Sequence, residues 1–173
     1  MITCRSLSGA DLAQWRPLRQ EALRLYPLAF LTTLEEELAR ADADVAKQLD
    51  AGFSYGAYDG DTLIGIAVLV TNKLARTRHR AMVATFYVTP SHHGSGTARM
   101  LMDHLKNVAV AQDVWQMELS VARSNPRALR FYESCGFWIS GASPNTIVVD
   151  GAPETDDLMI CLLPNAPEGA TRR

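Results

Sequence analysis

Apolar residues recur every three or four positions near the start of the chain, a spacing that places them on one face of a helix. The pattern predicts an amphipathic helix from Leu12 to Tyr26. Ser8 or Asp11 can cap its start, and Pro27 ends it. The apolar positions are Leu12, Trp15, Leu18, Ala22, Leu23 and Leu25.

A second helix is predicted to begin at Thr32 or Thr33 and to continue to about Leu49. Its first turn carries consecutive glutamates, which the helix dipole favours at that end. They are Glu35, Glu36 and Glu37.

Runs rich in β-branched and aromatic residues predict the strands. The clearest is a hairpin, in which residues 53–58 and 63–70 flank the turn Asp59-Gly60-Asp61. Residues 81–88 follow as a third strand of the same sheet. Further strands are predicted at residues 2–6, 116–122, 137–140 and 158–163.

Two more helices complete the predicted order of elements. One covers residues 98–112, and the other covers residues 127–134, with Asn125-Pro126 before it and Gly136 after it. The order β-α-α-β-β-β-α-β-α-β-β predicts a mixed α/β domain around one central sheet. Since no linker divides the chain, residues 1–164 are predicted to form a single domain, followed by a polar tail at 165–173 that frays.

The composition is that of an ordinary globular protein. The 173 residues are 47% apolar and 21% charged, which allows one domain with a core. A net charge of −2 provides no basic field for nucleic acid. No apolar run is long enough to span a membrane, and the N-terminal residues do not resemble a secretory signal. The scattered Cys4, Cys135 and Cys161 form no CxxC pair and favour a reduced, cytoplasmic setting.

The stretch "VTPSHHGSGTARM", from Val88 to Met100, carries the first chemical signal. Gly94 and Gly96 stand between a predicted strand and a predicted helix, whose first turn has unsatisfied N–H groups and a partial positive charge. Glycines there let the backbone approach a phosphate closely. No Gly-Lys-Ser/Thr follows, and Arg99 stands where a dinucleotide-binding loop has its third glycine. An ordinary turn before a helix explains the two glycines equally well.

A second signal lies downstream, in "LSVARSNPRALRFYESCGF". Together the two stretches resemble the GNAT superfamily of acyl-CoA-dependent N-acyltransferases. The family's loop pattern, Gln/Arg-x-x-Gly-x-Gly/Ala, falls on residues 93–98, with His93 in place of glutamine or arginine. The family's second pattern, Asn-x-x-Ala-x-x-x-Tyr-x-x-x-Gly-Phe, is matched at Asn125, Ala128, Tyr132, Gly136 and Phe137.

The resemblance implies a mixed central sheet of about six to seven strands flanked by helices, in which the fourth and fifth strands splay apart. It implies an N-acetyltransferase that moves an acetyl group from acetyl-CoA to a primary amine by direct attack in a ternary complex, with no metal. The loop amides would hold the pyrophosphate, and the exposed backbone of the fourth strand would pair with the pantetheine arm. The CoA-binding residues predicted in this way are Tyr87, Val88, Thr89, His93, Gly94, Ser95, Gly96, Thr97, Ala98, Asn125 and Ala128.

The resemblance makes Tyr132 the general acid that protonates the leaving thiolate, and a tyrosine packed beside Phe131 in the core is the alternative. Asn125 can bind the pantetheine arm or cap its helix. The family often carries the general base on the fourth strand, which has no acid here. Glu118 on the next strand is a weak candidate, Glu35 to Glu37 are others, and a chain of waters to backbone carbonyls is an alternative.

Competing interpretations remain open at this point. A non-catalytic acyl-CoA-binding regulatory module would keep the same fold, and an unrelated phosphate-binding α/β domain would lack the downstream match. The histidines show no regular metal-ligand spacing. The acceptor is expected to be a small-molecule or peptide amine, with neither nucleic acid nor membrane as a partner, and the apolar last strands permit a homodimer.

Overall fold

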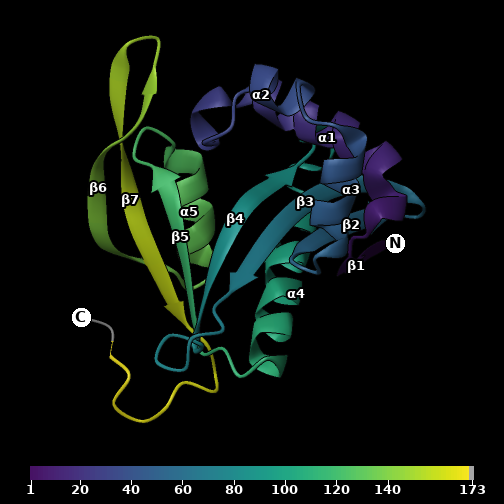
Figure 1. Cartoon of the computed structure of the whole chain (residues 1–173). Coiled ribbons are helices and arrows are strands. Elements are labelled where there is room, and N and C mark those ends of the chain that lie inside the picture. The colour runs from purple at the N-terminus through teal and green to yellow at the C-terminus, as the bar shows by residue number, and fades with distance from the viewer. Residues whose placement is uncertain (172–173) are drawn as a thin grey trace. The chain divides into compact units, whose positions relative to one another are not determined.

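A computed structural model describes residues 1–171 of the chain, and its seven strands pair in the order β1-β2-β3-β4-β5-β7-β6 (Figure 1). The β4–β5 pair is parallel, whereas β1–β2, β2–β3, β5–β7 and β6–β7 are antiparallel. This confirms the predicted mixed α/β class. The strands are β1 (Ile2–Ser6), β2 (Ser54–Asp59), β3 (Thr62–Thr71), β4 (Arg80–Val88), β5 (Gln116–Ala122), β6 (Trp138–Val149) and β7 (Ala152–Leu162).

The contacts group the chain into two compact units, and β4 passes from one to the other between Val83 and Ala84. Unit 1 comprises Met1–Leu69 and Ala84–Leu105, and unit 2 comprises Val70–Val83 and the residues from Lys106 onward. That residues 1–164 form one domain stays a prediction. Residues 172 and 173 of the predicted tail lie outside the described residues.

Unit 1 is built on an apolar cluster between helices and strands. Its helices are α1 (Leu12–Leu25), α2 (Leu34–Leu38), α3 (Asp42–Asp50) and most of α4 (Thr97–Ala111). Most of the predicted apolar face of α1 is buried, whereas Leu12 is only partly buried and Leu25 is exposed. Burying a leucine or larger side chain contributes about 1.5–3 kcal/mol. The cluster contains Leu7, Trp15, Leu18, Ala22, Val45, Leu49, Tyr58, Leu63, Ile66 and Tyr87.

The single helix predicted from Thr32 or Thr33 to Leu49 is wrong, since the chain forms two helices there. Thr33 does open α2, because its hydroxyl accepts the Glu36 N–H at 3.1 Å and the Glu36 carboxylate accepts the Thr33 N–H at 2.8 Å. Ala41 then adopts an extended conformation (φ −67°, ψ 144°). Asp42 and Asp44 in the first turn of α3 favour a new helix start at this point.

Unit 2 is dominated by a long hairpin of β6 and β7, with β7 also pairing with β5. The prediction of short strands at 137–140 and 158–163 is therefore wrong in length. Register shifts between Ile139 and Gly141 and between Ser143 and Ile147 interrupt the alternation that marks a strand in sequence. The turn is Asp150-Gly151, both with positive φ (51° and 79°), as a two-residue hairpin turn requires.

The last helix, α5 (Pro126–Ser134), is followed by Gly136 with φ 88°, where an added Cβ would lie 3.7 Å from the Cys161 sulfur. Phe137, Met117 and Met159 are buried in the same unit. The Lys106 ammonium donates to the Cys135 carbonyl oxygen and so ties α4 to this turn. Among residues 1–171, no helix is both long and apolar enough to cross a bilayer.

Candidate functional site

The glycine loop of unit 1 has the backbone conformation that glycine permits. A short 3₁₀ turn, Pro90–His92, follows β4, and α4 begins at Thr97. Gly94 and Gly96 have φ values of 78° and 87°, which other residues rarely adopt. A Cβ added at either position would meet no atom within 4 Å, so both glycines face open space.

Hydroxyl groups fix the shape of this loop. The Ser95 hydroxyl donates to the His92 carbonyl oxygen at 2.7 Å, and the Thr97 N–H donates to the Ser95 Oγ at 3.3 Å. The Ser95 and Thr97 hydroxyl oxygens are 2.8 Å apart, and Thr97 is fully buried. These hydrogen bonds therefore fix the conformation of the loop.

Several amides of the loop remain available. Within the described part of the chain, no acceptor bonds the N–H groups of Gly94, Gly96 and Ala98. They lie at the N-terminus of a 15-residue helix, where the helix dipole adds partial positive charge. Such a group of amides can bind an anion.

His93, the residue that departs from the family pattern, turns its ring toward the strand. Its Nε2 is 2.8 Å from the Val88 carbonyl oxygen. Because a carbonyl oxygen only accepts, Nε2 carries the proton and donates it. The ring thus ties the loop to the end of β4.

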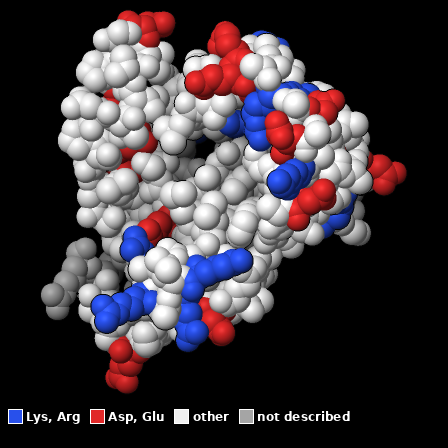
Figure 2. Space-filling model, in the orientation of Figure 1, with Lys and Arg blue, Asp and Glu red and all other residues white. Residues whose placement is uncertain are grey.

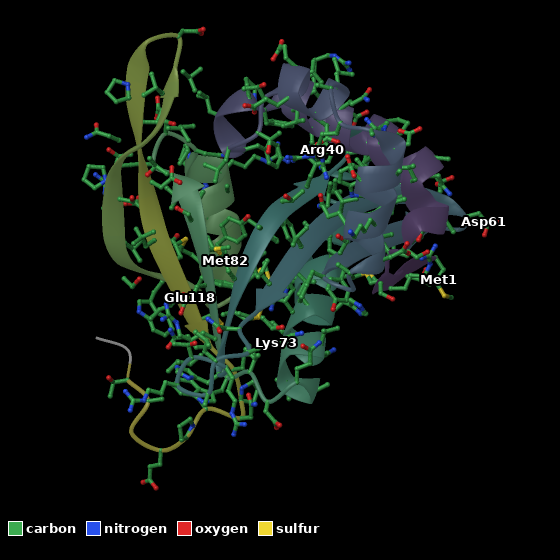
Figure 3. All side chains as sticks on the ribbon, in the orientation of Figure 1. Met1, Arg40, Asp61, Lys73, Met82 and Glu118 are labelled. Atoms are coloured by element: carbon green, nitrogen blue, oxygen red, sulfur yellow. The ribbon has the colours of Figure 1, made fainter. Side chains whose placement is uncertain are left out.

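The end of β4 departs from regular strand geometry. Thr85 has a φ of 48°, which is unusual for a β-branched residue. The β4–β5 register runs from Arg80 paired with Gln116 to Met82 paired with Glu118. Met82 and Glu118 are labelled in Figure 3. That the two strands splay beyond this register remains a prediction.

Glu21 is a residue of unit 1 that the sequence analysis missed. Its Oε1 accepts the Tyr87 hydroxyl at 2.6 Å and the Thr89 hydroxyl at 2.8 Å. Burial, together with this bond to a carboxylate, raises the pKa of Tyr87. The signal was present in the sequence, because Glu21 follows Leu18 by three positions and so shares the buried face of α1.

Glu118, the candidate base, lies in unit 2 with its carboxylate already engaged. The Arg80 guanidinium holds both of its oxygens, with the Nη2 to Oε2 distance at 2.7 Å, and the Gln116 amide donates to Oε1 at 2.7 Å. Burial raises the pKa of Glu118, but the bonds from Arg80 and Gln116 outweigh it and hold the pKa below its usual value. A lowered pKa makes Glu118 a weaker proton acceptor.

Tyr132 and Asn125 also belong to unit 2. Tyr132 lies on α5, with its ring 5.3 Å from the Phe131 ring and 5.9 Å from the Phe137 ring, and burial raises the pKa of its phenol. Asn125 caps the helix, because its Oδ1 accepts the Ala128 N–H at 3.1 Å. This is one of the two roles predicted for Asn125, and it leaves the amide NH₂ group for other contacts.

The structure thus places Tyr87, Val88, Thr89 and the loop residues 93–98 together in unit 1. Glu118, Asn125, Ala128 and Tyr132 belong to unit 2.

Lys, Arg, Asp and Glu side chains are interspersed over the face shown in Figure 2. Among the described residues, no group of three or more His, Cys, Asp or Glu side chains could hold a metal ion.

Comparison with known proteins identifies the family that this chain matches. Residues 15–137 match the model of the acetyltransferase (GNAT) family. An uncharacterised N-acetyltransferase of Mycobacterium bovis is 32% identical over 78 residues, which are 45% of this chain and 49% of that protein. The spermidine N(1)-acetyltransferase of Vibrio cholerae is 29% identical over 90 residues, 51% of this chain and 50% of that protein.

The chain thus spans about half the length of the curated relatives it matches. Among solved structures, a Salmonella typhimurium protein determined with its cofactor acetyl-CoA superposes with a TM-score of 0.81. That superposition covers 100% of this chain and 98% of the other, at 20% identity. At this identity the similarity concerns the fold.

Proposed function

Since the chain belongs to the acetyltransferase (GNAT) family, we propose that it transfers an acyl group, most simply acetyl, from CoA to a primary amine. The observation that carries the proposal is the glycine loop at the start of α4. Gly94 and Gly96 face open space, and the N–H groups of Gly94, Gly96 and Ala98 have no acceptor within residues 1–171. This arrangement suits the pyrophosphate of CoA.

The cosubstrate would supply an acyl thioester. In this proposal the loop residues 93–98 hold its phosphates, and the backbone of Tyr87, Val88 and Thr89 pairs with the pantetheine arm. Asn125 contributes its amide NH₂ group to the arm while its Oδ1 caps α5. Because the pyrophosphate and the pantetheine arm are both bound chiefly by backbone in this proposal, His93 can stand where the family has arginine or glutamine.

Tyr132 is proposed to give its proton to the thiolate as the C–S bond breaks. Its raised pKa keeps the phenol protonated at neutral pH, which a proton donor requires. The same raised pKa makes it a weak acid, so the proton moves only as negative charge develops on the sulfur. Glu118, the weak candidate for the base, has its carboxylate bound to Arg80, which does not suit it to accept a proton.

The acceptor is proposed to be a primary amine on a small molecule or a peptide. The Vibrio cholerae relative is a spermidine acetyltransferase, which makes polyamines one class to test. The cytoplasm is the proposed location, where acetyl-CoA is available and the free Cys4, Cys135 and Cys161 would stay reduced.

A thiol-release assay tests this function. Purified protein is mixed with acetyl-CoA and spermidine, benzylamine or alanine amide, and free CoA thiol is followed with a chromogenic reagent, while calorimetry measures CoA binding. Turnover with any of these amines that Tyr132→Phe reduces would support the enzyme. CoA binding without thiol release across a broad amine panel would instead support a non-catalytic acyl-CoA-binding module.

A further inference from the structure

Two hydrogen bonds hold the carboxylate of Glu21 in place, but no cationic side chain among residues 1–171 pairs with it. It lies on α1, half-buried, and its Oε1 accepts hydrogen bonds from Tyr87 at 2.6 Å and Thr89 at 2.8 Å. Within the described chain no Lys, Arg or His forms an ion pair with it, and no donor bonds its other oxygen. The Oε2 atom has no hydrogen-bond partner among the described residues, yet it is not one of the buried polar atoms without a partner. Solvent therefore reaches it.

Most of the other buried or partly buried carboxylates among residues 1–171 form an ion pair with arginine. The pairs are Asp11 with Arg5, Glu37 with Arg40, Glu118 with Arg80, and Asp157 with Arg123. Among residues 1–171 no arginine pairs with Asp156, whose carboxylate accepts the Ser120 hydroxyl at 2.8 Å. Removing a carboxylate from water without a cation is costly, so a site of this kind favours a cationic ligand.

The surroundings of Glu21 suit an ammonium group in particular. The Tyr26 and Tyr87 rings lie with their centroids 6.0 Å apart, and Tyr87 itself donates to Glu21. Aromatic faces beside a carboxylate attract organic cations. Tyr87 and Thr89 also flank Val88, on the segment proposed to pair with the arm that carries the thioester.

We infer that Glu21 binds the ammonium group of the acceptor through Oε2 and removes a proton from it, an inference that rests on the proposed acyl transfer. The proton passes from nitrogen to Oε2, and the freed lone pair forms the C–N bond to the acyl carbon. The C–S bond breaks with its electron pair on sulfur. The nitrogen loses a second proton while the sulfur gains one, and Glu21 returns its proton to solvent. The preferred acceptor is thus a protonated alkylamine.

The test compares Glu21→Gln with the wild type on two amines. Benzylamine is protonated at pH 7, whereas aniline is already neutral. We expect kcat/KM for benzylamine to fall about 100-fold, the range of a lost general base, and kcat/KM for aniline to fall by no more than about fivefold. At pH 10 much of the benzylamine is neutral, so kcat/KM of Glu21→Gln for benzylamine should be lower than that of the wild type by about tenfold or less. Glu168→Gln, the same chemical change in the exposed C-terminal tail, is the matched control and should behave as the wild type.

The outcomes separate the inference from the proposed function. A wild-type protein that binds CoA but acetylates no amine would overturn the function. A wild type that is active, with Glu21→Gln within twofold of it on benzylamine, would overturn only the role of Glu21. Thermal melting and CoA calorimetry show whether Glu21→Gln is folded.

If Glu21→Gln does not fold, Tyr87→Phe provides the second test. It removes one donor to Oε1 and retains the ring. Without that bond the Oε1 atom keeps only the Thr89 hydroxyl, so kcat/KM for benzylamine should fall by about tenfold, whereas kcat/KM for aniline should stay within about twofold. A value for benzylamine within twofold of the wild type would contradict the inference.

Discussion

Replacing Gly96 by alanine should weaken CoA binding far more than it weakens the fold. Gly96 has a φ of 87°, and an L-residue held in this left-handed region costs about 1–2 kcal/mol. No heavy atom lies within 4 Å of the added Cβ, so no steric overlap increases that cost. The free energy of unfolding should therefore fall by about 1–2 kcal/mol.

The effect on CoA comes from the space that the new methyl group fills. That space is the open face of the loop, where the proposed pyrophosphate would meet the N–H groups of Gly96 and Ala98. A hydrogen bond to a charged group contributes about 1.5–3 kcal/mol. Losing one such bond corresponds to about a 10- to 150-fold increase in the Kd for CoA.

Calorimetric titration with CoA and urea unfolding measure the two effects on the same samples. Gly52→Ala is the matched control, because Gly52 has a φ of 81°, faces open space and follows α3 in the same unit. Both variants should lose similar stability, whereas only Gly96→Ala should lose CoA affinity. Wild-type affinity in Gly96→Ala would refute the placement of the phosphates against this loop.

Three other predictions address the phenol, the histidine and one ion pair. Tyr132→Phe should lower kcat by at least about 100-fold in the thiol-release assay without weakening CoA binding, and an unchanged kcat would remove Tyr132 from the chemistry. His93→Ala should lower the free energy of unfolding by about 1 kcal/mol, because the Val88 carbonyl oxygen loses its donor, and should raise the Kd for CoA by less than about tenfold. A larger loss in calorimetry would show that the ring contacts the phosphates. Asp11→Asn should cost about 1–2 kcal/mol at pH 7, allowing for the half-exposed Arg5 partner. The Arg5 guanidinium lowers the pKa of Asp11, so this stabilisation is complete above the ordinary carboxyl pKa of about 4 and is lost as the pH falls through the lowered value. Urea unfolding should show the same difference between variant and wild type at pH 7 and 5 and a smaller difference at pH 3, and a difference independent of pH would contradict the assignment.

Elements with strong local signals could be predicted from the sequence. The 3.6-residue period of α1, the Asp59-Gly60-Asp61 turn and the glycine after α5 each specify their structure through nearby residues. The break at Ala41 and the length of β6 and β7 could not be predicted in the same way. The break depends on Ala41 being extended among residues that all favour a helix. The strand lengths depend on bulges that disrupt the alternation of apolar and polar residues.

The same distinction holds for the candidate site. A phosphate loop is specified by backbone geometry, so its glycines and the following helix are visible in sequence. The spacing from Leu18 places Glu21 on the buried face of α1, but its partner Tyr87 is 66 positions away and cannot be identified from the nearby sequence. For Glu118 the sequence was misleading. A glutamate on a predicted strand beside the proposed site was a reasonable candidate base, but the structure shows its carboxylate bound to Arg80.

The end of β4 links the two parts of the unit 1 site. The Val88 carbonyl oxygen receives the His93 ring N–H at 2.8 Å, which positions the glycine loop. The Tyr87 and Thr89 hydroxyls on either side position Glu21. A Cβ at Gly65 on β3 would lie 3.1 Å from the Tyr87 carbonyl oxygen, so a glycine there permits the close approach of the two strands. Three consecutive residues thus contact both the loop proposed for the phosphates and the carboxylate proposed for the amine.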